Sequence, residues 1–394
     1  MNFLKKYHFF MPADILFGIG AVNDLAAEIK KRGCKKPLIV TDKNIKSIIE
    51  RVTGLLQDED ISAAIYDEVV YEPTLEFVKE GLNLYKENNC DSVIALGGGS
   101  CIDAAKGVAV MATNPGEIEL YKGNNKIKEP AAPLIAIPTT AGTASEVSLT
   151  IVLTDTKYND KFIINDPKVI PILAIEDPEL TVELPASVTA YSGIDALTHA
   201  IEGFIVNRPA NMGLGGESLT DVAAREAIRL ISTNIRTAHA NGKDIEARYN
   251  MMLGQLLAGM TFSNSGTALV HGLARPLGAY FHVPHGLANA IMLPIGMEFT
   301  WQGCPDKCKE IAFCMGEEVK DLPVNKASEL AVQAIRKLCE DLNIPRLSDL
   351  DITKDALEKV VVDMATNGFE SGTPKANPRK PKIEEMVEMY WEAF

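Results

Sequence analysis

One carboxylate and three imidazoles stand out as residues whose types and spacing suit metal binding. Asp195 and His199 are four residues apart in GIDALTHAIEGF, a segment with the apolar periodicity of a helix, so both side chains should project from one helix face. His271 and His285 follow in LVHGLARP and VPHGLANA. Such a set suits Fe(II) or Zn(II) and leaves room for a substrate oxygen as a further ligand.

Taken singly, each of these histidines would be interpreted as a packed or surface residue, and only the set of four side chains argues for a metal. The other three of the six histidines lack a comparable apolar, small-residue setting. Cys304, Cys308 and Cys314 also cluster. They have neither a second pair nor a nearby histidine, so we interpret them as helix-packing residues.

A glycine-rich loop provides a candidate phosphate site. The predicted strand DSVIAL (91–96) runs into GGGS (97–100), and residues 103–106 then open a predicted helix. Glycines let the backbone approach an anion, and the free N–H groups at a helix N-terminus attract it. The loop is neither GxGxxG nor a P-loop. A tight turn without a ligand is the alternative interpretation.

Two further features support a dinucleotide. The predicted strand PLIAI (133–137) runs into PTTAGTASE (138–146), whose hydroxyl groups can bind a ribose, a phosphate or a carboxamide; the alternative is an N-cap for the next segment. Asp42 directly follows the predicted strand PLIVT (37–41). A carboxylate there can accept hydrogen bonds from ribose hydroxyls and repel a 2′-phosphate, which favours NAD over NADP. A surface cap is the alternative.

The elements around these residues indicate two domains. Helical segments at 21–31 and 74–88 alternate with the three apolar strands, which is typical of a mostly parallel α/β sheet. Runs at 150–154 and 172–175 could add a hairpin or edge strands. Later segments at 188–205, 214–239, 245–260 and 326–342 have helical periodicity. We predict an α/β dinucleotide-binding domain over 1–186 and an all-helical, metal-binding domain over 187–394.

Composition excludes several classes of function. The formal net charge is −14, which disfavours nucleic acid and anionic membranes as partners. No apolar run approaches the roughly 20 residues that a membrane span needs, and residues 1–10 lack a signal-peptide pattern. The seven cysteines are scattered and odd in number. We therefore expect reduced thiols and a cytoplasmic protein.

Five motifs together resemble the iron-containing (group III) alcohol dehydrogenases, a family that includes lactaldehyde reductases and 1,3-propanediol dehydrogenases. The resemblance covers nearly the full length and is highly specific for the set, although GGGS alone would not be. The motifs are GGGSCIDAAK (97–106), PTTAGTASEV (138–147), GIDALTHAIEGF (193–204), HGLARPLGAYFHVPH (271–285) and NPRKP (377–381).

The resemblance implies a Rossmann-like N-terminal domain, a helical C-terminal domain, NAD(P) as cofactor, for which Asp42 favours NAD, and a small alcohol or aldehyde as substrate. It implies a homodimer or larger homo-oligomer. It places a divalent metal, Fe²⁺ or Zn²⁺, on Asp195, His199, His271 and His285, and a wall of the substrate pocket on Phe262. The implied cofactor contacts are Asp42, Gly97, Gly98, Gly99, Ser100, Asp103, Thr139, Thr140, Thr143, Lys161 and Leu180.

The sequence departs from the family pattern at a position that bears on substrate choice. The family usually has a histidine four residues after the third ligand, where it has been linked to proton relay; here that position is Arg275. The position before Pro73, usually Asn, is Glu72, the Asn expected near residue 150 is replaced by Thr150, and GTPKA precedes NPRKP. These changes bear on the proton route and the substrate.

Arg275 should share a helix face with His271 and point into the site, which makes both residues candidates for a direct catalytic role. A guanidinium does not deprotonate at neutral pH, so it is a poor general acid or base, but it binds carboxylates and sulfonates well. With Lys375 as a second cation, Arg275 predicts a small anionic aldehyde such as sulfoacetaldehyde or an ω-semialdehyde.

Three alternatives remain at this point. The enzyme could act on neutral short alcohols or diols, with Arg275 paired to Glu72 or contacting the cofactor. A lyase of the dehydroquinate synthase type shares the glycine loop and the two-domain plan, but it is expected to have glutamate where this chain has Asp195. A non-catalytic, metal-stabilised protein would bind metal without a dinucleotide.

Overall fold

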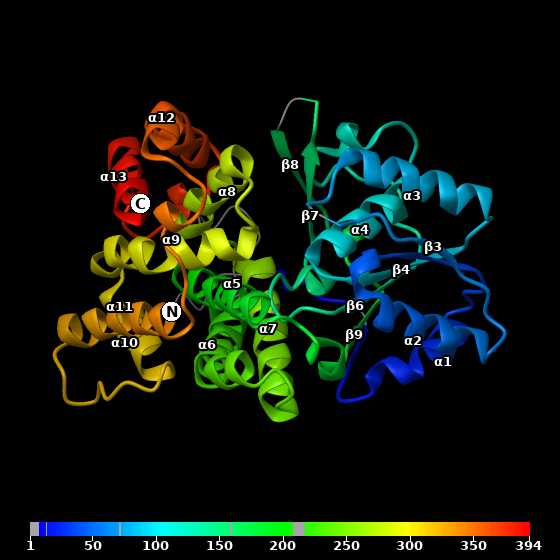
Figure 1. Cartoon of the computed structure of the whole chain (residues 1–394), viewed down its shortest axis with the longest axis horizontal. Helices are drawn as coiled ribbons and strands as arrows, with labels where there is room; N and C mark the ends of the chain where they lie inside the picture. The colour runs from blue at the N-terminus through cyan, green and yellow to red at the C-terminus, as the bar shows by residue number, and fades with distance from the viewer. Residues whose placement is uncertain (1–7, 13, 71, 158–159, 208–216) are drawn as a thin grey trace. The chain divides into compact units, whose positions relative to one another are not determined.

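Two units make up the chain in the computed structural model, which describes residues 8–12, 14–70, 72–157, 160–207 and 217–394 (Figure 1). Residues 10–140 and 144–183 form an α/β unit, and residues 184–394 form a helical unit. The short segment Ala141–Thr143 groups with the helical unit by its contacts. None of the described helices is long and apolar enough to cross a membrane.

A six-stranded sheet forms the centre of the α/β unit, and every pair of neighbouring strands in it is parallel. Its strand order is β1-β9-β6-β4-β2-β3. The strands are β1 (Asp14–Phe17), β2 (Pro37–Val40), β3 (Ala64–Tyr66), β4 (Ser92–Gly97), β6 (Leu134–Pro138) and β9 (Leu173–Glu176). The three predicted apolar strands are therefore confirmed as β2, β4 and β6.

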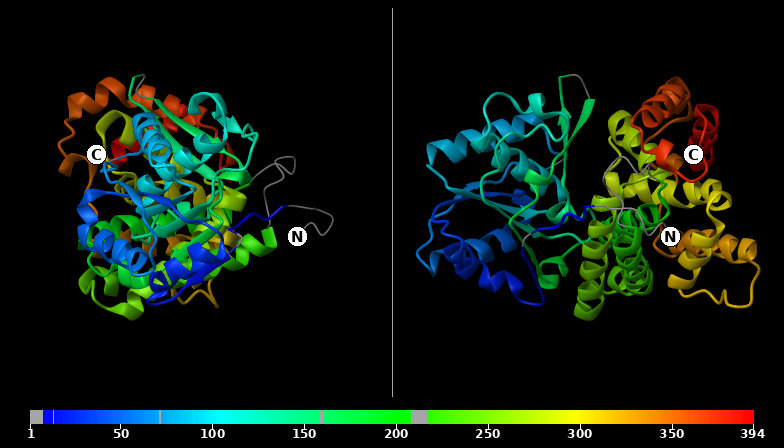
Figure 2. Two further views of the ribbon diagram at one scale, coloured as in Figure 1. Left: turned by 90° about the vertical axis from the view of Figure 1, so that its right-hand side faces the viewer. Right: turned by 180° about the vertical axis from the view of Figure 1, so that it is seen from behind.

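Helices cover both faces of this sheet, which is why its central strands are apolar throughout (Figure 2). Ile94 and Leu96 of β4 pack into one core, and Val93 and Ala95 pack into the other, as the two-residue period of a strand requires. Helices α1 (Leu25–Lys31) and α2 (Lys46–Gln57) contribute to the first core. Helices α3 (Leu75–Glu87) and α4 (Gly99–Thr113) contribute to the second.

A second, three-stranded sheet contains β5 (Gly123–Asn124), β8 (Asp160–Asn165) and β7 (Thr150–Asp155), in that order. Strands β7 and β8 pair antiparallel, so the hairpin expected at 150–154 is confirmed. The expectation of an edge strand or hairpin at 172–175 is wrong. Strand β9 is internal because the four-residue strand β1 pairs with its outer side.

The helical unit is built around one large apolar core to which most of its helices contribute. The predicted helices at 188–205, 245–260 and 326–342 are confirmed as α5, α7 and α11 within a few residues. The predicted helix at 214–239 is confirmed as α6 from residue 217 onward, and residues 214–216 lie outside the described residues. The helices are α5 (Ala186–Ile205), α6 (Glu217–Ala240), α7 (Ile245–Ser265), α8 (Leu269–Phe281), α9 (His285–Thr300), α10 (Pro305–Cys314), α11 (Val324–Asp341), α12 (Lys354–Glu370) and α13 (Ile383–Ala393).

Helix α8 is supported by segments much later in the chain. Pro276 lies inside it and supplies no N–H to the helix. A Cβ on Gly368 of α12 would overlap the Gly272 carbonyl oxygen, so only glycine permits this approach. The hydroxyl of Tyr390, a fully buried residue of α13, donates a 2.8 Å hydrogen bond to the Leu273 carbonyl. These contacts fix the helix that carries His271.

Candidate metal centre and cofactor loops

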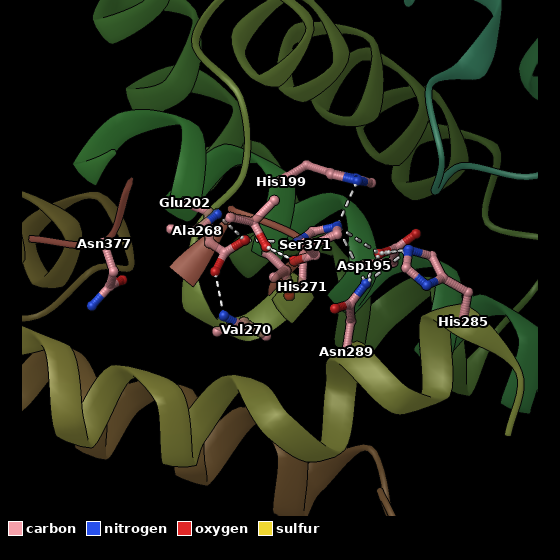
Figure 3. A network of polar contacts seen from close by, with 12 residues as sticks. Asp195, His199, Glu202, Ala268, Val270, His271, His285, Asn289, Ser371 and Asn377 are labelled. Carbon is pink, nitrogen blue, oxygen red and sulfur yellow. Dashed lines mark hydrogen bonds and ion pairs between the residues drawn. The ribbon is translucent and has the colours of Figure 1, made fainter. Parts of the chain in front are cut away.

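Helices α5, α8 and α9 bring the four predicted metal ligands together (Figure 3). Asp195 and His199 come from α5, His271 from the first turn of α8, and His285 is the first residue of α9. One potential ligand atom from each of the four lies within 4.8 Å of the others. Two signals in the sequence, the four-residue helical spacing and the shared setting of the later histidines, thus led to one cluster.

The distances between donor atoms fit a single cation. The Nε2 atoms of His199 and His271 are 3.0 Å apart. The Oδ1 atom of Asp195 lies 4.0 Å from Nε2 of His271 and 3.9 Å from Nε2 of His285. Metal–nitrogen bonds of about 2.0–2.1 Å in a tetrahedral site place neighbouring ligand atoms about 3.4 Å apart. The four potential ligand atoms lie within 4.8 Å of one another, so the more distant of them would move closer together to reach this geometry.

Two polar partners of the cluster were not predicted. Glu202, on the same face of α5, accepts a 2.7 Å hydrogen bond from Nδ1 of His271. The Asn289 amide nitrogen donates to Oδ1 of Asp195 at 2.6 Å and lies 3.2 Å from Nε2 of His285. The helical spacing holds a weak signal for both, since Glu202 follows His199 by three residues and Asn289 follows His285 by four.

Burial controls the charge state of this cluster. It raises the pKa of Asp195 to about 7, against a hydrogen bond from Asn289 that lowers it. It likewise raises the pKa of Glu202 to about 7, against backbone hydrogen bonds that lower it. Burial lowers the pKa of His199 and His271 well below the ordinary range, helped by the neighbouring His271 and Arg275 charges respectively. Both imidazoles are therefore neutral at pH 7, the form that binds metals.

Neutral imidazoles facing each other fit a cation between them. The Nδ1 atom of His271 is directed at a carboxylate and acts as the donor, so its Nε2 atom carries a lone pair. That atom faces Nε2 of His199 in a setting where both residues are at most 5 % exposed. The chemistry of the donor set, three imidazole nitrogens and one carboxylate oxygen, fits a divalent metal of the Fe(II) or Zn(II) type.

Phe262 and Arg275 lie beside the predicted metal ligands. The Phe262 ring, on α7, stacks on the His199 ring with centroids 4.2 Å apart. Arg275 is partly buried on α8, and burial lowers the pKa of its guanidinium. Its positive charge lowers the pKa of both His199 and His271. Among the described residues, no hydrogen bond or ion pair to this guanidinium is found.

Lys375 has different surroundings. Its side chain is exposed, and its ammonium group lies over the Phe369 ring, 4.9 Å from the centroid. The cation–π contact holds the charge on the surface of the helical unit. Its predicted role toward a substrate stays a prediction.

In the α/β unit, most of the predicted cofactor residues lie at the ends of four neighbouring strands. Asp42 comes after β2, GGGS (97–100) after β4, Thr139 and Thr140 after β6, and Leu180 after β9. These strands are consecutive in the sheet and parallel, so their carboxyl ends share one edge. Helix α4 begins at Gly99, within the glycine loop. The arrangement matches the edge at which open α/β sheets bind their ligands.

Local contacts show how these loops are held. Gly97 has a φ of +146°, and a Cβ there would stand 2.6 Å from Sγ of Cys101, so glycine is needed at this position. The Thr139 N–H donates to the Gly97 carbonyl at 3.0 Å and ties the two loops together. The carboxylate of Asp103 accepts hydrogen bonds from Ser145 and from the Val152 N–H. Asp103 therefore braces α4 against the segment that follows β6.

Asp42, Thr143 and Lys161 differ in their surroundings from the other predicted cofactor residues. Asp42 does act as a cap, because its Oδ1 atom accepts a 2.9 Å hydrogen bond from the Asn44 N–H. Its predicted contact with a ribose stays a prediction. Thr143 groups with the helical unit. Lys161 lies in β8, and its side chain is outside the described residues.

Comparison with known proteins places the chain in a family. Residues 12–178 match the profile of the iron-containing alcohol dehydrogenases, and residues 189–394 match the profile of the C-terminal part of the Fe-containing alcohol dehydrogenase family. Lactaldehyde reductase of Escherichia coli (strain K12) is 39 % identical over 386 residues, covering 96 % of this chain and 97 % of that protein. The chain belongs to the iron-containing alcohol dehydrogenase family, and it is an oxidoreductase of the alcohol dehydrogenase type.

Solved structures agree with this placement. A crystal structure of 1,3-propanediol oxidoreductase is similar with a TM-score of 0.94 and 36 % identity, covering 99 % of this chain and 100 % of that one. Sulfoacetaldehyde reductase from Bifidobacterium kashiwanohense, solved in complex with NAD⁺, has a TM-score of 0.86 and 27 % identity, with 98 % of each chain covered. The predicted family and fold class are confirmed.

Proposed function

We propose that this protein is an NAD-dependent and divalent-metal-dependent alcohol dehydrogenase that interconverts a small alcohol and its aldehyde. The observation that carries the proposal is the buried cluster of one carboxylate and three imidazoles, whose potential ligand atoms lie within 4.8 Å of one another. When bound, a divalent cation supplies Lewis acidity to the oxygen of the alcohol or aldehyde, and NAD accepts or donates the hydride.

The residues of the chain have distinct roles in this proposal. Asp195, His199, His271 and His285 hold the cation, and Phe262 keeps His199 in place by stacking on its ring. The loops after β2, β4, β6 and β9 bind the dinucleotide, with the backbone of GGGS (97–100) against its phosphates. Asp42 receives the ribose hydroxyls and selects NAD over NADP.

The test measures metal content and NADH oxidation on the same preparation. Protein loaded with Fe(II) or Zn(II) should oxidise NADH in the presence of a small aldehyde such as propanal, and removal of the metal with a chelator should abolish turnover. NADPH should be a poorer cofactor than NADH. Undiminished turnover in a preparation shown to be metal-free would refute the metal's role.

For the substrate, we propose a small anionic aldehyde, such as sulfoacetaldehyde or an ω-semialdehyde. The Arg275 guanidinium is partly buried beside two of the metal ligands, and none of the described residues pairs with it. A substrate carboxylate or sulfonate would supply the missing partner through paired hydrogen bonds. The NAD⁺-bound relative named for sulfoacetaldehyde fits this chemistry, whereas the relative named for lactaldehyde favours a neutral substrate.

A panel of aldehydes decides between the two substrate classes. The value of kcat/KM for sulfoacetaldehyde and succinic semialdehyde should exceed that for propanal and lactaldehyde. Arg275→Ala should lower the anionic values by about 10²-fold, the scale of one lost charged hydrogen-bonding pair, and should leave the neutral values within a few-fold. Faster reduction of neutral aldehydes, unaffected by Arg275→Ala, would favour neutral short alcohols or diols instead.

A further inference from the structure

Glu202 is the third acidic or metal-ligating residue on one face of α5, after Asp195 and His199. It follows His199 by three residues and is 1 % exposed. An isolated carboxylate at such a position would be strongly destabilising, because burial removes its hydration. Its partners therefore determine what it does.

Three N–H groups converge on the Glu202 carboxylate, and all come from the beginning of α8 (Figure 3). The Oε1 atom accepts from the Val270 N–H at 2.5 Å. The Oε2 atom accepts from the Ala268 N–H at 2.8 Å and from Nδ1 of His271 at 2.7 Å. The first two donors are free backbone groups at a helix N-terminus, where the helix dipole also favours an anion.

The third hydrogen bond decides which nitrogen of His271 is available. With Nδ1–H donating to the carboxylate, the lone pair of the neutral ring resides on Nε2. That atom is the one 3.0 Å from Nε2 of His199 and 4.0 Å from Oδ1 of Asp195. The hydrogen bonds from the Ala268 and Val270 N–H groups fix the carboxylate itself. The carboxylate in turn fixes the imidazole through Nδ1, on the side of the ring away from Nε2.

We propose that Glu202 is a positioning residue of the metal centre. Its hydrogen bond from Nδ1 of His271 sets the orientation of the imidazole ring and leaves the lone pair on Nε2 for the metal. The inference rests on the proposed metal site. It adds a residue that does not touch the cation.

The test compares metal affinity in the full-length apo protein, with Zn²⁺ measured by chelator competition and Co²⁺ by its visible absorption. Glu202→Gln keeps the side-chain volume but turns an NH₂ group toward at least one of the three N–H donors. We expect Zn²⁺ affinity to fall about 10- to 100-fold at unchanged one-to-one stoichiometry, and the Co²⁺ spectrum to change in shape. Glu202→Asp keeps the charge and both acceptor oxygens and should lose less affinity.

A matched control separates this role from a general loss of stability. Asp166 is also 1 % exposed and also accepts two backbone N–H groups, from Ile127 and Lys168, but it lies in the α/β unit. Asp166→Asn should leave the Zn²⁺ affinity and the Co²⁺ spectrum unchanged. If Glu202→Gln does not fold, Glu202→Asp and the His271 ¹⁵N shifts in the wild-type apo protein still test the proposal, since a protonated Nε2 would overturn it.

The outcomes also separate this inference from the proposed function. If the wild type binds Zn²⁺, His199→Ala does not, and Glu202→Gln binds within twofold of the wild type, the positioning role is wrong while the metal site stands. If the wild type itself binds no Zn²⁺, or His199→Ala binds as well as the wild type, both proposals fail.

Discussion

The two units of this protein differ in the kind of group that their predicted binding sites contain. The α/β unit presents loop backbone and short side chains at the ends of neighbouring parallel strands, as in Gly97 and Thr139. The helical unit presents ionisable side chains, such as His199 and His271, that are almost wholly buried. The first arrangement depends on backbone conformation, and the second depends on the identity of individual side chains. Substitutions in the α/β unit should therefore act through backbone strain, and substitutions in the helical unit should act through the loss of a particular side chain.

The largest effect is expected in the helical unit. His199→Ala removes one predicted ligand and the partner of the Phe262 ring. We expect kcat/KM to fall by about 10³-fold or more, since Lewis acidity contributes several kcal/mol to the transition state. The Kd for NADH should stay within about threefold of the wild type by fluorescence titration. A comparable loss of NADH binding would contradict the assignment of metal binding to the helical unit and of NADH binding to the α/β unit.

The buried guanidinium of Arg248, which lies outside the predicted metal site, should contribute to the stability of the helical unit. Arg248 is 2 % exposed and donates to the Gly242 carbonyl, to Oγ1 of Thr189 and to the Leu184 carbonyl. Arg248→Met leaves these acceptors without their donors. We expect the free energy of unfolding in urea to fall by about 2–4 kcal/mol.

The control for this prediction is Arg229→Met. Arg229 is an exposed residue whose main partner is Glu226, three residues earlier on α6. Its loss should cost no more than about 0.5 kcal/mol. Equal losses for the two variants would show that burial of the Arg248 guanidinium contributes nothing to stability.

The corresponding test in the α/β unit changes backbone rather than charge. Gly97→Ala places a Cβ at a φ of +146° and within overlap of Cys101, a strain of about 1–3 kcal/mol. The Kd for NADH should rise about tenfold, while the Zn²⁺ affinity measured by chelator competition stays unchanged. Gly54→Ala, in open space on α2, should alter neither quantity. A weakened metal site in Gly97→Ala would contradict the separation of the two units.

Lys375 should give the smallest effect. Its exposed ammonium lies on the Phe369 ring, where solvent screens its charge. Lys375→Ala should lower kcat/KM for an anionic aldehyde by no more than about threefold, much less than Arg275→Ala. A loss as large as that of Arg275→Ala would place Lys375 against the substrate after all.

Sequence reasoning found the residues whose spacing is local. Asp195 and His199 were predicted from one helical period, and the strand-to-loop junctions at 42, 97 and 138 from apolar runs that end abruptly. It missed Glu202 because a glutamate within a helix usually faces solvent, and its partners at 268–271 are about seventy residues away in sequence. Only the packing of α5 against α8 brings them together.

The misplaced strand has a similar cause. The run at 172–175 is apolar enough for either an edge or an interior strand. Its position was decided by β1, which has four residues and pairs with β9 from more than 150 residues earlier in the chain. Periodicity identifies a strand, but it does not reveal a short, distant neighbour. The four predicted metal ligands and the central strands could thus be predicted from the sequence. The distant contacts of Glu202 and of strand β1 could not.

The hydrogen bond from Tyr390 to the Leu273 carbonyl has a consequence for how the protein is made. It joins helix α8 to a residue that lies 117 positions later in the chain. During translation, His271 leaves the ribosome well before the segment that secures its helix. This support of the helix that carries His271 therefore arrives only when α13 has been synthesised, so we expect the proposed metal to bind after that segment has left the ribosome rather than during growth of the chain.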